Sequence, residues 1–313
     1  MLPTVSIIIV SYNTKAILLQ CLHSLREHVQ QTSFETVVVD NASHDGTAEA
    51  VAADFPEVIL IRNNENRGFA CANNQGIARA RGEYLLFLNP DTVFVEDAIT
   101  PVLAYMEAHS RVGIGGCKIL SSDRELQPSF FPLPNLLTMS WTAFFLDRLL
   151  PLNCLNGRWV IGRRHPTAPT RVQRLLGAYL FVRRRALVEV GGFDETFFLF
   201  CEEEDFCHRM VLHNWEIHYL PVCSIVHLGG QSTTQENVAA IVHANAGKVH
   251  YFRKHHERAT QILFRAIWFL ALVLRLMLAL RLPASQRRHM IRAYCQSLPL
   301  LFQPLKPEAE GTC

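Results

Sequence analysis

The segment VSIIIVSYN, residues 5–13, is a nearly unbroken run of aliphatic side chains that ends in polar ones. Successive side chains of a strand point to opposite faces, so a run without alternation predicts a strand buried on both faces. Strands of this kind belong to parallel sheets that carry helices on both sides. The segment therefore predicts an α/β fold with its first strand inside the sheet.

Helical and strand periodicities alternate after this segment. Apolar residues between 17 and 29 fall on one helix face, and a helix over 70–81 is expected to end at Gly82 as a C′ glycine. Three further strands are predicted, at ETVVVD (35–40), EVILIR (57–62) and EYLLFLNPD (83–91). Strands alternating with helices indicate a doubly wound, mostly parallel sheet of the Rossmann-like type.

Each of the four strands runs into polar residues. These ends are Ser11-Tyr12-Asn13, Asp40-Asn41, the segment NNENRGF (63–69) and Asn89-Pro90-Asp91. A single aspartate at a strand end is usually a turn former or a helix cap. Ligands bind outside the carboxyl ends of the strands in such sheets, so four polar ends together predict a binding crevice.

The second half of the chain has a less regular pattern. GAYLFVRR (177–184) predicts a strand, and an aromatic cluster then leads into four adjacent acids, Glu202 to Asp205. IHYLPVCSIVHLGGQST (217–233) suggests two short strands followed by a loop that contains Ser232.

Composition limits the class of protein. The chain has 313 residues, 49% of them hydrophobic and 19% charged, which suits one large domain or a catalytic domain with a tail. A net charge of +2 gives no support for a nucleic-acid partner. Nine cysteines without a C-x-x-C pair favour a reducing cytosol, and MLPTVSIIIVSYN lacks the basic region of a signal peptide.

Several common active-site motifs are missing. The first strand is followed neither by G-x-G-x-x-G nor by a Walker A lysine loop, and no serine lies in a G-x-S-x-G elbow. Cys201, Cys207 and His208 lack the spacing of zinc ligands, so structural roles are expected for them.

Three groups of residues could carry chemistry. Asn89-Pro90-Asp91 offers hard oxygen ligands on a rigid turn, which suits Mg²⁺ or Mn²⁺ shared with substrate phosphates. The four acids from Glu202 repel one another, so at least one should have a raised pKa and suit a general base; alternatively, some only favour the dipole in the first turn of a helix. His227 gains a role in metal binding only if it faces Asp91.

Five stretches together resemble the family-2 nucleotide-sugar glycosyltransferases, in particular the rhamnosyltransferase-like branch of bacterial surface-polysaccharide synthesis. In order they are VSIIIVSYN, VVVDNASHDGT, NRGFACANNQGIARARGEYLLFLNPD, GAYLFVRRRALVEVGGFDETFFLFCEEEDFCHR and HLGGQST, which span residues 5 to 233. The resemblance implies a GT-A fold and an inverting transfer of sugar from a nucleoside diphosphate.

The same resemblance implies roles for individual residues. Ser11, Tyr12 and Asn13 would line the nucleotide pocket, Asp40 would contact a pyrimidine base, Asn41 and Asp45 would support the ribose or its loop, and Asn66, Arg67, Gly68 and Asn89 would lie near the nucleotide or its diphosphate. Asp91 and His227 would bind the metal. The family's E-D-x-D pattern falls on Glu202, Glu203 and Asp205.

The chain departs from the family pattern at two positions. Asn89 stands where D-x-D has its first acid, and Glu203 replaces the aspartate of E-D-x-D. Glu203 is the expected base, with Glu202 as the alternative. A non-catalytic nucleotide-sugar-binding protein and a nucleotidyltransferase are the competing functions. dTDP-rhamnose is the donor that this branch suggests, UDP- and GDP-sugars stay open, and the acceptor would be a glycan or a lipid-linked molecule.

The chain is expected to divide into a catalytic domain, residues 1–233, and a helical basic region, residues 234–313. The catalytic domain would comprise a nucleotide-binding half (1–118) and an acceptor half (119–233). No acid occurs from Arg258 to Pro307, and the apolar run AIWFLALVLRLMLAL (266–280) lies within that stretch. These features favour a helix lying on an anionic membrane, at the cytoplasmic face, over a core helix. NLLTMSWTAFFLDRLLPL (135–152) is a second candidate for a membrane-facing or acceptor-facing element, or a core or lid helix.

Overall fold

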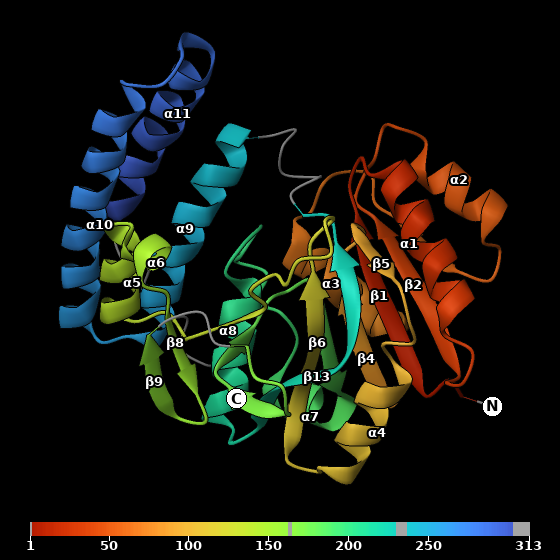
Figure 1. Ribbon diagram of the computed structural model, residues 1–313. Helices are drawn as coiled ribbons and strands as arrows, with labels where there is room; N and C mark the ends of the chain where they lie inside the picture. Colours follow the sequence, from red (N-terminus) through yellow and green to blue (C-terminus); the bar gives the residue numbers. More distant parts are fainter. Residues whose placement is uncertain (1, 162–164, 230–236, 303–313) are drawn as a thin grey trace, which may run out of the picture. The chain divides into compact units, whose positions relative to one another are not determined.

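A computed structural model describes residues 2–161, 165–229 and 237–302 of the chain (Figure 1). It consists of two compact units. The first comprises residues 1–133 and 147–235, and the second comprises residues 134–146 and 236–313. The predicted domain boundary at 233 falls outside the described residues, and the predicted halves of the catalytic domain stay predictions.

The first unit is built on a sheet with the strand order β3-β2-β1-β4-β12-β6-β13-β10-β8-β9, in which β5 pairs with β13. The strands are β1 (Val5–Ser11), β2 (Phe34–Asp40), β3 (Ile59–Arg62), β4 (Tyr84–Leu88), β5 (Thr92–Phe94), β6 (Val112–Leu120), β8 (Leu152–Leu155), β9 (Arg158–Ile161), β10 (Thr170–Val172), β12 (Tyr179–Arg183) and β13 (Glu216–His227); β7 (Phe130–Phe131) and β11 (Arg174–Leu175) form a separate pair.

The predicted α/β class is confirmed, with a parallel core formed by the first four predicted strands. β1 is parallel to β2 and to β4, and β2 is parallel to β3. β12 then runs antiparallel between β4 and β6, while β13 is parallel to β6. The complete sheet is therefore mixed, and its parallel part carries the polar strand ends.

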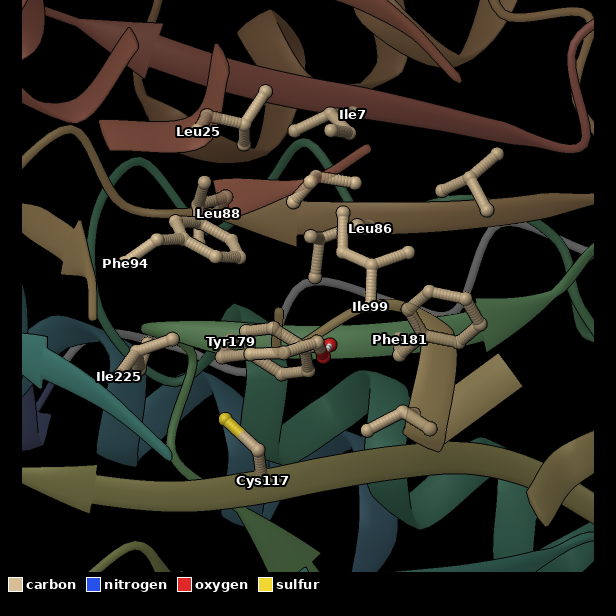
Figure 2. Close-up of a cluster of buried hydrophobic side chains, with 14 of the residues drawn as sticks. Ile7, Leu25, Leu86, Leu88, Phe94, Ile99, Cys117, Tyr179, Phe181 and Ile225 are labelled. Carbon is tan, nitrogen blue, oxygen red and sulfur yellow. Dashed lines mark hydrogen bonds between the residues drawn. The ribbon is translucent and has the colours of Figure 1, made fainter. Parts of the chain in front are cut away.

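The aliphatic run of β1 contributes to both faces of the sheet, as its pattern predicts. Ile7 and Ile9 belong to one buried cluster, and Ile8 and Val10 belong to the other. Figure 2 shows the first cluster, where Leu86 and Leu88 of β4 lie opposite residues of β12. Both faces of the strand are covered, so β1 is fixed in register and its polar end is fixed with it.

Helices cover both faces of the sheet. They are α1 (Lys15–His28), α2 (Thr47–Asp54), α3 (Phe69–Arg79), α4 (Thr100–Ala108), α7 (Arg184–Val190) and α8 (Glu202–Leu212). The short α6 (Leu146–Leu149) contains the position in the sequence where the second unit ends and the first resumes. Residues of α1 and α4 pack into the first cluster, and residues of α3 and α8 pack into the second.

Two local predictions are wrong. Helix α3 ends at Arg79, and Gly82 is required instead by packing, because a Cβ there would lie 2.5 Å from the backbone nitrogen of Ser6. The region 217–227 forms one strand, β13, whose register shifts between Leu220 and Ser224. Such a bulge interrupts the periodicity without ending the strand, which explains the expectation of two short strands.

The second unit consists of α5 (Leu136–Ala143), α9 (Asn237–His255), α10 (Arg258–Ala279), α11 (Ala284–Ser297) and the 3₁₀-helix η1 (Leu298–Phe302). A buried polar contact links three of these helices. Trp268 of α10 donates to Asn245 Oδ1 of α9 at 2.8 Å, and Asn245 Nδ2 donates to Ser297 Oγ of α11 at 3.0 Å. Helix α10 is long and apolar enough to cross a membrane by length and composition alone, a property that core helices of soluble proteins share.

Candidate active site

The ends of β1 and β2 lie next to each other at the carboxyl edge of the parallel strands. Ser11 pairs with Asp40 in the parallel register, and the Asn41 backbone N–H donates to the Ser11 carbonyl at 2.8 Å. The Ser11 hydroxyl is fully buried and shares a 2.8 Å hydrogen bond with Thr14 Oγ1. Ser11 therefore holds the start of the α1 region in place, while Tyr12 stays half-buried at the edge.

One carboxylate oxygen of Asp40 accepts a hydrogen bond, and the other has no hydrogen-bond partner. Oδ2 accepts from the Ser43 backbone N–H at 3.3 Å. Oδ1 is buried and has no hydrogen-bond partner, although the residue is only 4% exposed. A buried acceptor without a partner costs free energy, so its presence at this edge points to a donor that arrives with a ligand.

The loop after β2 is tied to the loop after β1. Asn13 adopts a left-handed conformation (φ 51°), and its backbone N–H donates to Ser43 Oγ at 2.9 Å. Asp45 accepts from the backbone N–H groups of Lys15 and Thr47 at 2.9 and 3.1 Å. Although burial raises the pKa of Asp45, hydrogen bonds from Thr47 and Lys15 outweigh it and lower that pKa. The carboxylate thus braces the starts of α1 and α2.

Asn41 organises the loop between β3 and α3. Its Nδ2 donates to Asn66 Oδ1 at 2.8 Å and to the Gly68 carbonyl at 3.3 Å. Its Oδ1 accepts from Asn63 Nδ2 and from the Arg67 backbone N–H, both at 3.0 Å. Both the nitrogen and the oxygen of this side-chain amide are hydrogen-bonded within the protein, as expected for a residue that supports the loop.

Gly68 brings this loop against the segment that precedes α8. Its φ is 82°, and a Cβ at this position would lie 2.6 Å from the Phe198 carbonyl oxygen. The same carbonyl accepts from the Phe69 backbone N–H at 2.7 Å. Only glycine combines this φ with this approach, so the contact between the two loops depends on Gly68. The neighbouring Arg67 is exposed at the rim.

Asp91 and His227 face each other, as the metal-binding prediction requires. Thr92 in β5 pairs with His227 at the end of β13, and His227 Nε2 lies 3.3 Å from Asp91 Oδ1. Both residues are less than a tenth exposed. His227 Nδ1 lies 3.2 Å from Gln127 Oε1. When Nδ1 carries the proton and donates to this oxygen, the Nε2 lone pair points to the Asp91 side.

The donor set fits a divalent cation. Two adjacent ligands of an octahedral Mg²⁺ or Mn²⁺ at about 2.1 Å lie about 3 Å apart, close to the separation of Nε2 and Oδ1. Within the described part of the chain no group of three or more His, Cys, Asp or Glu side chains could hold a metal. Asp91 and His227 could hold such a cation only together with further ligands, which substrate phosphates and water would provide.

The predicted acidic patch forms the first turn of α8. All four acids, Glu202, Glu203, Glu204 and Asp205, lie in that turn, where negative charge favours the helix dipole. The two residues before the helix, Phe200 and Cys201, both have left-handed φ values of 70°. Consecutive non-glycine residues in this conformation are strained, which is common where a loop must aim a functional element.

The acids of this turn have different partners. Asp205 is fully buried, and its Oδ2 accepts from Arg209 Nε at 2.7 Å. Glu202 is 5% exposed, and its Oε2 is buried without a hydrogen-bond partner. Burial, and secondarily the charge of Glu203, raises the pKa of Glu202 well above its usual range. Asp205 is thus an ion-paired anchor, and Glu202 is a buried acid with one carboxylate oxygen that has no hydrogen-bond partner.

Glu203 combines access with a raised pKa. Its side chain is 16% exposed and lies 3.5 Å from Arg174 Nη1, which also pairs with Glu204 at 2.7 Å. Burial raises the pKa of Glu203, the charge of Glu204 raises it further, and Arg174 partly opposes both. A carboxylate with a raised pKa at a partly open position suits general-base chemistry.

The start of α8 lies against the strand that neighbours the Asn-Pro-Asp turn. A Cβ at Gly177 would lie 3.5 Å from Glu203 Cγ. The next residue, Ala178, accepts at its carbonyl from the backbone N–H of half-buried Asn89 at 3.1 Å. Asn89 lies two positions before Asp91 in the turn. The base candidate, on α8, thus lies beside the start of β12, which is hydrogen-bonded to the turn that carries the metal candidate.

Sequence reasoning missed Gln127, Arg174 and the Phe198 carbonyl. Gln127 lies 100 positions before the histidine that it orients, and Arg174 lies 30 positions before Glu204. Neither residue belongs to a local motif. A basic residue near a buried acidic patch is expected on electrostatic grounds, yet its position comes only from the pairing of β11 with β7.

Comparison with known proteins places the first part of this chain in a family. Residues 6–139 match the family described as glycosyl transferase family 2. An N-acetylglucosaminyl-diphospho-decaprenol L-rhamnosyltransferase of Mycobacterium tuberculosis is 29% identical over 211 residues, 64% of this chain and 68% of the relative. The rhamnosyltransferase WbbL of Escherichia coli is 27% identical over 168 residues, 51% of this chain and 60% of the relative.

Solved structures share the fold. A mannosyltransferase of Pyrobaculum calidifontis, in complex with GDP-Man and Mn²⁺, has a TM-score of 0.57 at 17% identity, covering 96% of this chain and 87% of that one. TarS of S. aureus, in complex with UDP-GlcNAc, has a TM-score of 0.54 at 18% identity, covering 95% and 82%. The fold is that of the GT-A glycosyltransferases. The match over residues 6–139 assigns this part of the chain to glycosyl transferase family 2, and in its motifs and its sheet the chain is similar to enzymes that transfer sugar from a nucleotide sugar.

Proposed function

We propose that the chain is an inverting, metal-dependent transferase that moves a hexose, with rhamnose as the first candidate, to a glycan or lipid-linked acceptor of surface-polysaccharide synthesis. The observation that carries this proposal is the juxtaposition of two chemically different groups. Glu203 packs against Gly177, and the following residue is hydrogen-bonded to Asn89 of the turn that carries Asp91. A base on α8, beside one strand end, and a diphosphate-binding group at the neighbouring strand end would suit displacement at a carbon between them.

Asp40 and the loop around Gly68 form the nucleotide end of the site in this proposal. The unpartnered Oδ1 of Asp40 would accept the N3–H of a pyrimidine base, which removes the free-energy cost of its burial. The exposed guanidinium of Arg67 would approach the diphosphate. Tyr12 and Asn13 would line the pocket, while Ser11 and Asn41 hold the strand ends in position through the hydrogen bonds described above.

Asp91 Oδ1 and His227 Nε2 would hold the divalent cation together with the diphosphate. A cation bound there would neutralise the charge that develops on the leaving diphosphate. Gln127 would keep the histidine in the tautomer that presents Nε2. Asn89 contributes no charge, so Asp91 is the single carboxylate ligand from this turn.

Glu203 would remove the proton of the acceptor hydroxyl. The hydroxyl oxygen then forms a bond to the anomeric carbon as the bond from that carbon to the diphosphate breaks, and one displacement of this kind inverts the anomeric centre. Glu203 is preferred over Asp205 because Asp205 is already ion-paired with Arg209. It is preferred over Glu202 because the Glu202 carboxylate is the more deeply buried of the two.

The names of relatives and structural neighbours support the substrate classes. Two relatives are rhamnosyltransferases, and the name of one specifies a decaprenol-linked acceptor. The two neighbouring structures hold GDP-Man with Mn²⁺ and UDP-GlcNAc. These names make dTDP-rhamnose the first donor to test, with UDP- and GDP-sugars as alternatives.

A donor panel tests the function. The purified chain should be stabilised against thermal unfolding by one sugar nucleotide when Mn²⁺ is present, and should release its nucleoside diphosphate. Stabilisation without release, under any acceptor tried, would favour a non-catalytic binding protein. Formation of a sugar nucleotide and pyrophosphate from a sugar phosphate and a nucleoside triphosphate would instead identify a nucleotidyltransferase.

The charge of Arg174 should set the lower pH limit of activity. Arg174 partly offsets the burial and the Glu204 charge that raise the pKa of Glu203, so Arg174→Gln should raise that pKa further. Because only the ionised carboxylate accepts a proton, the fall of kcat/KM on acidification should then begin at higher pH. Arg174→Lys keeps the charge and should restore the wild-type midpoint. A uniform loss of rate at all pH values would show that Arg174 is only structural.

A further inference from the structure

The outward face of α10 is apolar along its whole length. Exposed side chains recur at helical spacing, three, four or seven residues apart, as expected for one face of a helix. They are Ile262, Leu263, Ala266, Phe269, Leu270, Met277 and Leu280, the last directly after the helix, and Leu270 is 58% exposed. The Phe302 ring lies 6.0 Å from that of Phe269 and is itself 69% exposed. We call these residues the α10 stripe.

The opposite face of α10 holds the second unit together. Phe264, Trp268 and Leu272 are buried there, with the Phe264 ring stacked 3.9 Å from Phe252 of α9. The Arg275 guanidinium also belongs to this face, since it donates to the Ala143 carbonyl of α5 at 3.0 Å. The helix therefore presents the charge of Arg275 to its own bundle and the apolar side chains of the α10 stripe to the surroundings, the reverse of a water-facing helix.

The charged residues within α10 and directly after it are all basic. Arg258 and Arg265 lie three or four residues from Ile262, and Arg281 lies four residues from Met277, so arginines flank the stripe. Helix α11 adds exposed Arg287 and Arg288. The described residues from Arg258 to Phe302 include no Asp or Glu. An apolar stripe with basic flanks is complementary to the interface of an anionic bilayer.

We propose that the α10 stripe lies in the plane of an anionic lipid bilayer, at the cytoplasmic face of the membrane, with the stripe inserted among the acyl chains and the arginines at the headgroups. A spanning orientation is disfavoured because α10 packs along α11, whose exposed arginines would be carried into the hydrocarbon (Figure 1). A second copy of the chain is disfavoured because a two-fold contact would bring the same acid-free surface against itself.

Vesicle sedimentation with the full chain tests this proposal. The wild-type protein should bind to vesicles of phosphatidylcholine and phosphatidylglycerol. Arg287→Gln and Arg288→Gln should each lower the partition coefficient about fivefold, because each removes one exposed arginine. Leu270→Asp should lower partitioning by at least about tenfold. Val188→Asp, at a 75% exposed position on α7, is the matched control and should leave partitioning unchanged. Ile262→Asp repeats the test at a second position.

Four results would overturn the proposal. Wild-type protein that ignores anionic vesicles would exclude the lipid surface, and so would Leu270→Asp and Ile262→Asp variants that bind as wild type does. Protein that resists extraction by alkaline carbonate would show that α10 crosses the bilayer. A dimer in lipid-free solution that Leu270→Asp dissociates, together with no vesicle binding, would assign the stripe to a second copy. Each readout is independent of catalytic activity.

Discussion

Replacing Glu203 by glutamine is expected to lower the rate of sugar transfer by roughly 10²–10⁴-fold, the usual contribution of one well-placed general base. Glutamine has nearly the same volume and cannot accept the proton of the acceptor hydroxyl. The affinity for the sugar nucleotide should be almost unchanged, because no nucleotide contact is assigned to this side chain. Transfer rates and donor dissociation constants, measured on the same preparation, check both halves of the expectation.

Glu204→Gln is the matched control for this variant. Glu204 lies in the same helical turn, its side chain is equally 16% exposed, and it pairs with the same Arg174. Its replacement should leave most of the transfer rate intact. A Glu203→Gln variant with near-normal turnover, combined with an inactive Glu202→Gln variant, would move the base to Glu202.

Replacing Asp91 by asparagine is expected to weaken Mn²⁺-dependent binding of the nucleoside diphosphate by at least about tenfold, because the single carboxylate of the turn is removed. Binding of the nucleoside without phosphates should not change, since it would depend on Asp40. Calorimetric titrations of the diphosphate and the nucleoside, with and without Mn²⁺, separate the two contributions.

Two further variants sharpen the metal experiment. Gln127→Ala leaves both proposed ligands in place and removes only the partner of His227 Nδ1, so it should cost roughly 10–100-fold in metal affinity. Asp123→Asn, an exposed acid outside the site, should bind Mn²⁺ and diphosphate as wild type does. Equal Mn²⁺ dependence in Asp91→Asn and wild type would exclude Asp91 as a ligand.

The parallel half of the fold could be predicted because its strands are buried on both faces. In VSIIIVSYN almost every side chain is apolar, and the structure distributes them between two clusters as that pattern requires. Polar residues that interrupt such a strand mark its end, so the sequence also located Asp40 and Asp91. From the sequence, a role for His227 in metal binding depended on its facing Asp91. The register of β13 against β5 brings the two side chains together.

Contacts between distant segments could not be predicted. In the sequence, Gly82 resembles a helix cap. In the structure, glycine is required there because a Cβ would collide with the backbone of Ser6 in β1. The partners of His227 and of Glu203 depend on pairings that local periodicity does not encode. Helix α10 is a similar case. The sequence shows an apolar helix that contains Arg275, but only the contact with α5 shows on which face of the helix that arginine lies.

The structure of Glu203→Gln with a bound nucleoside diphosphate sugar and Mn²⁺ is the most direct test of the proposed site. The predicted result has the base at Asp40 Oδ1, the diphosphate and the ion at Asp91 and His227, and the anomeric carbon facing residue 203. A sugar whose anomeric carbon faces away from residue 203, or an ion held without Asp91, would contradict the mechanism proposed for this chain.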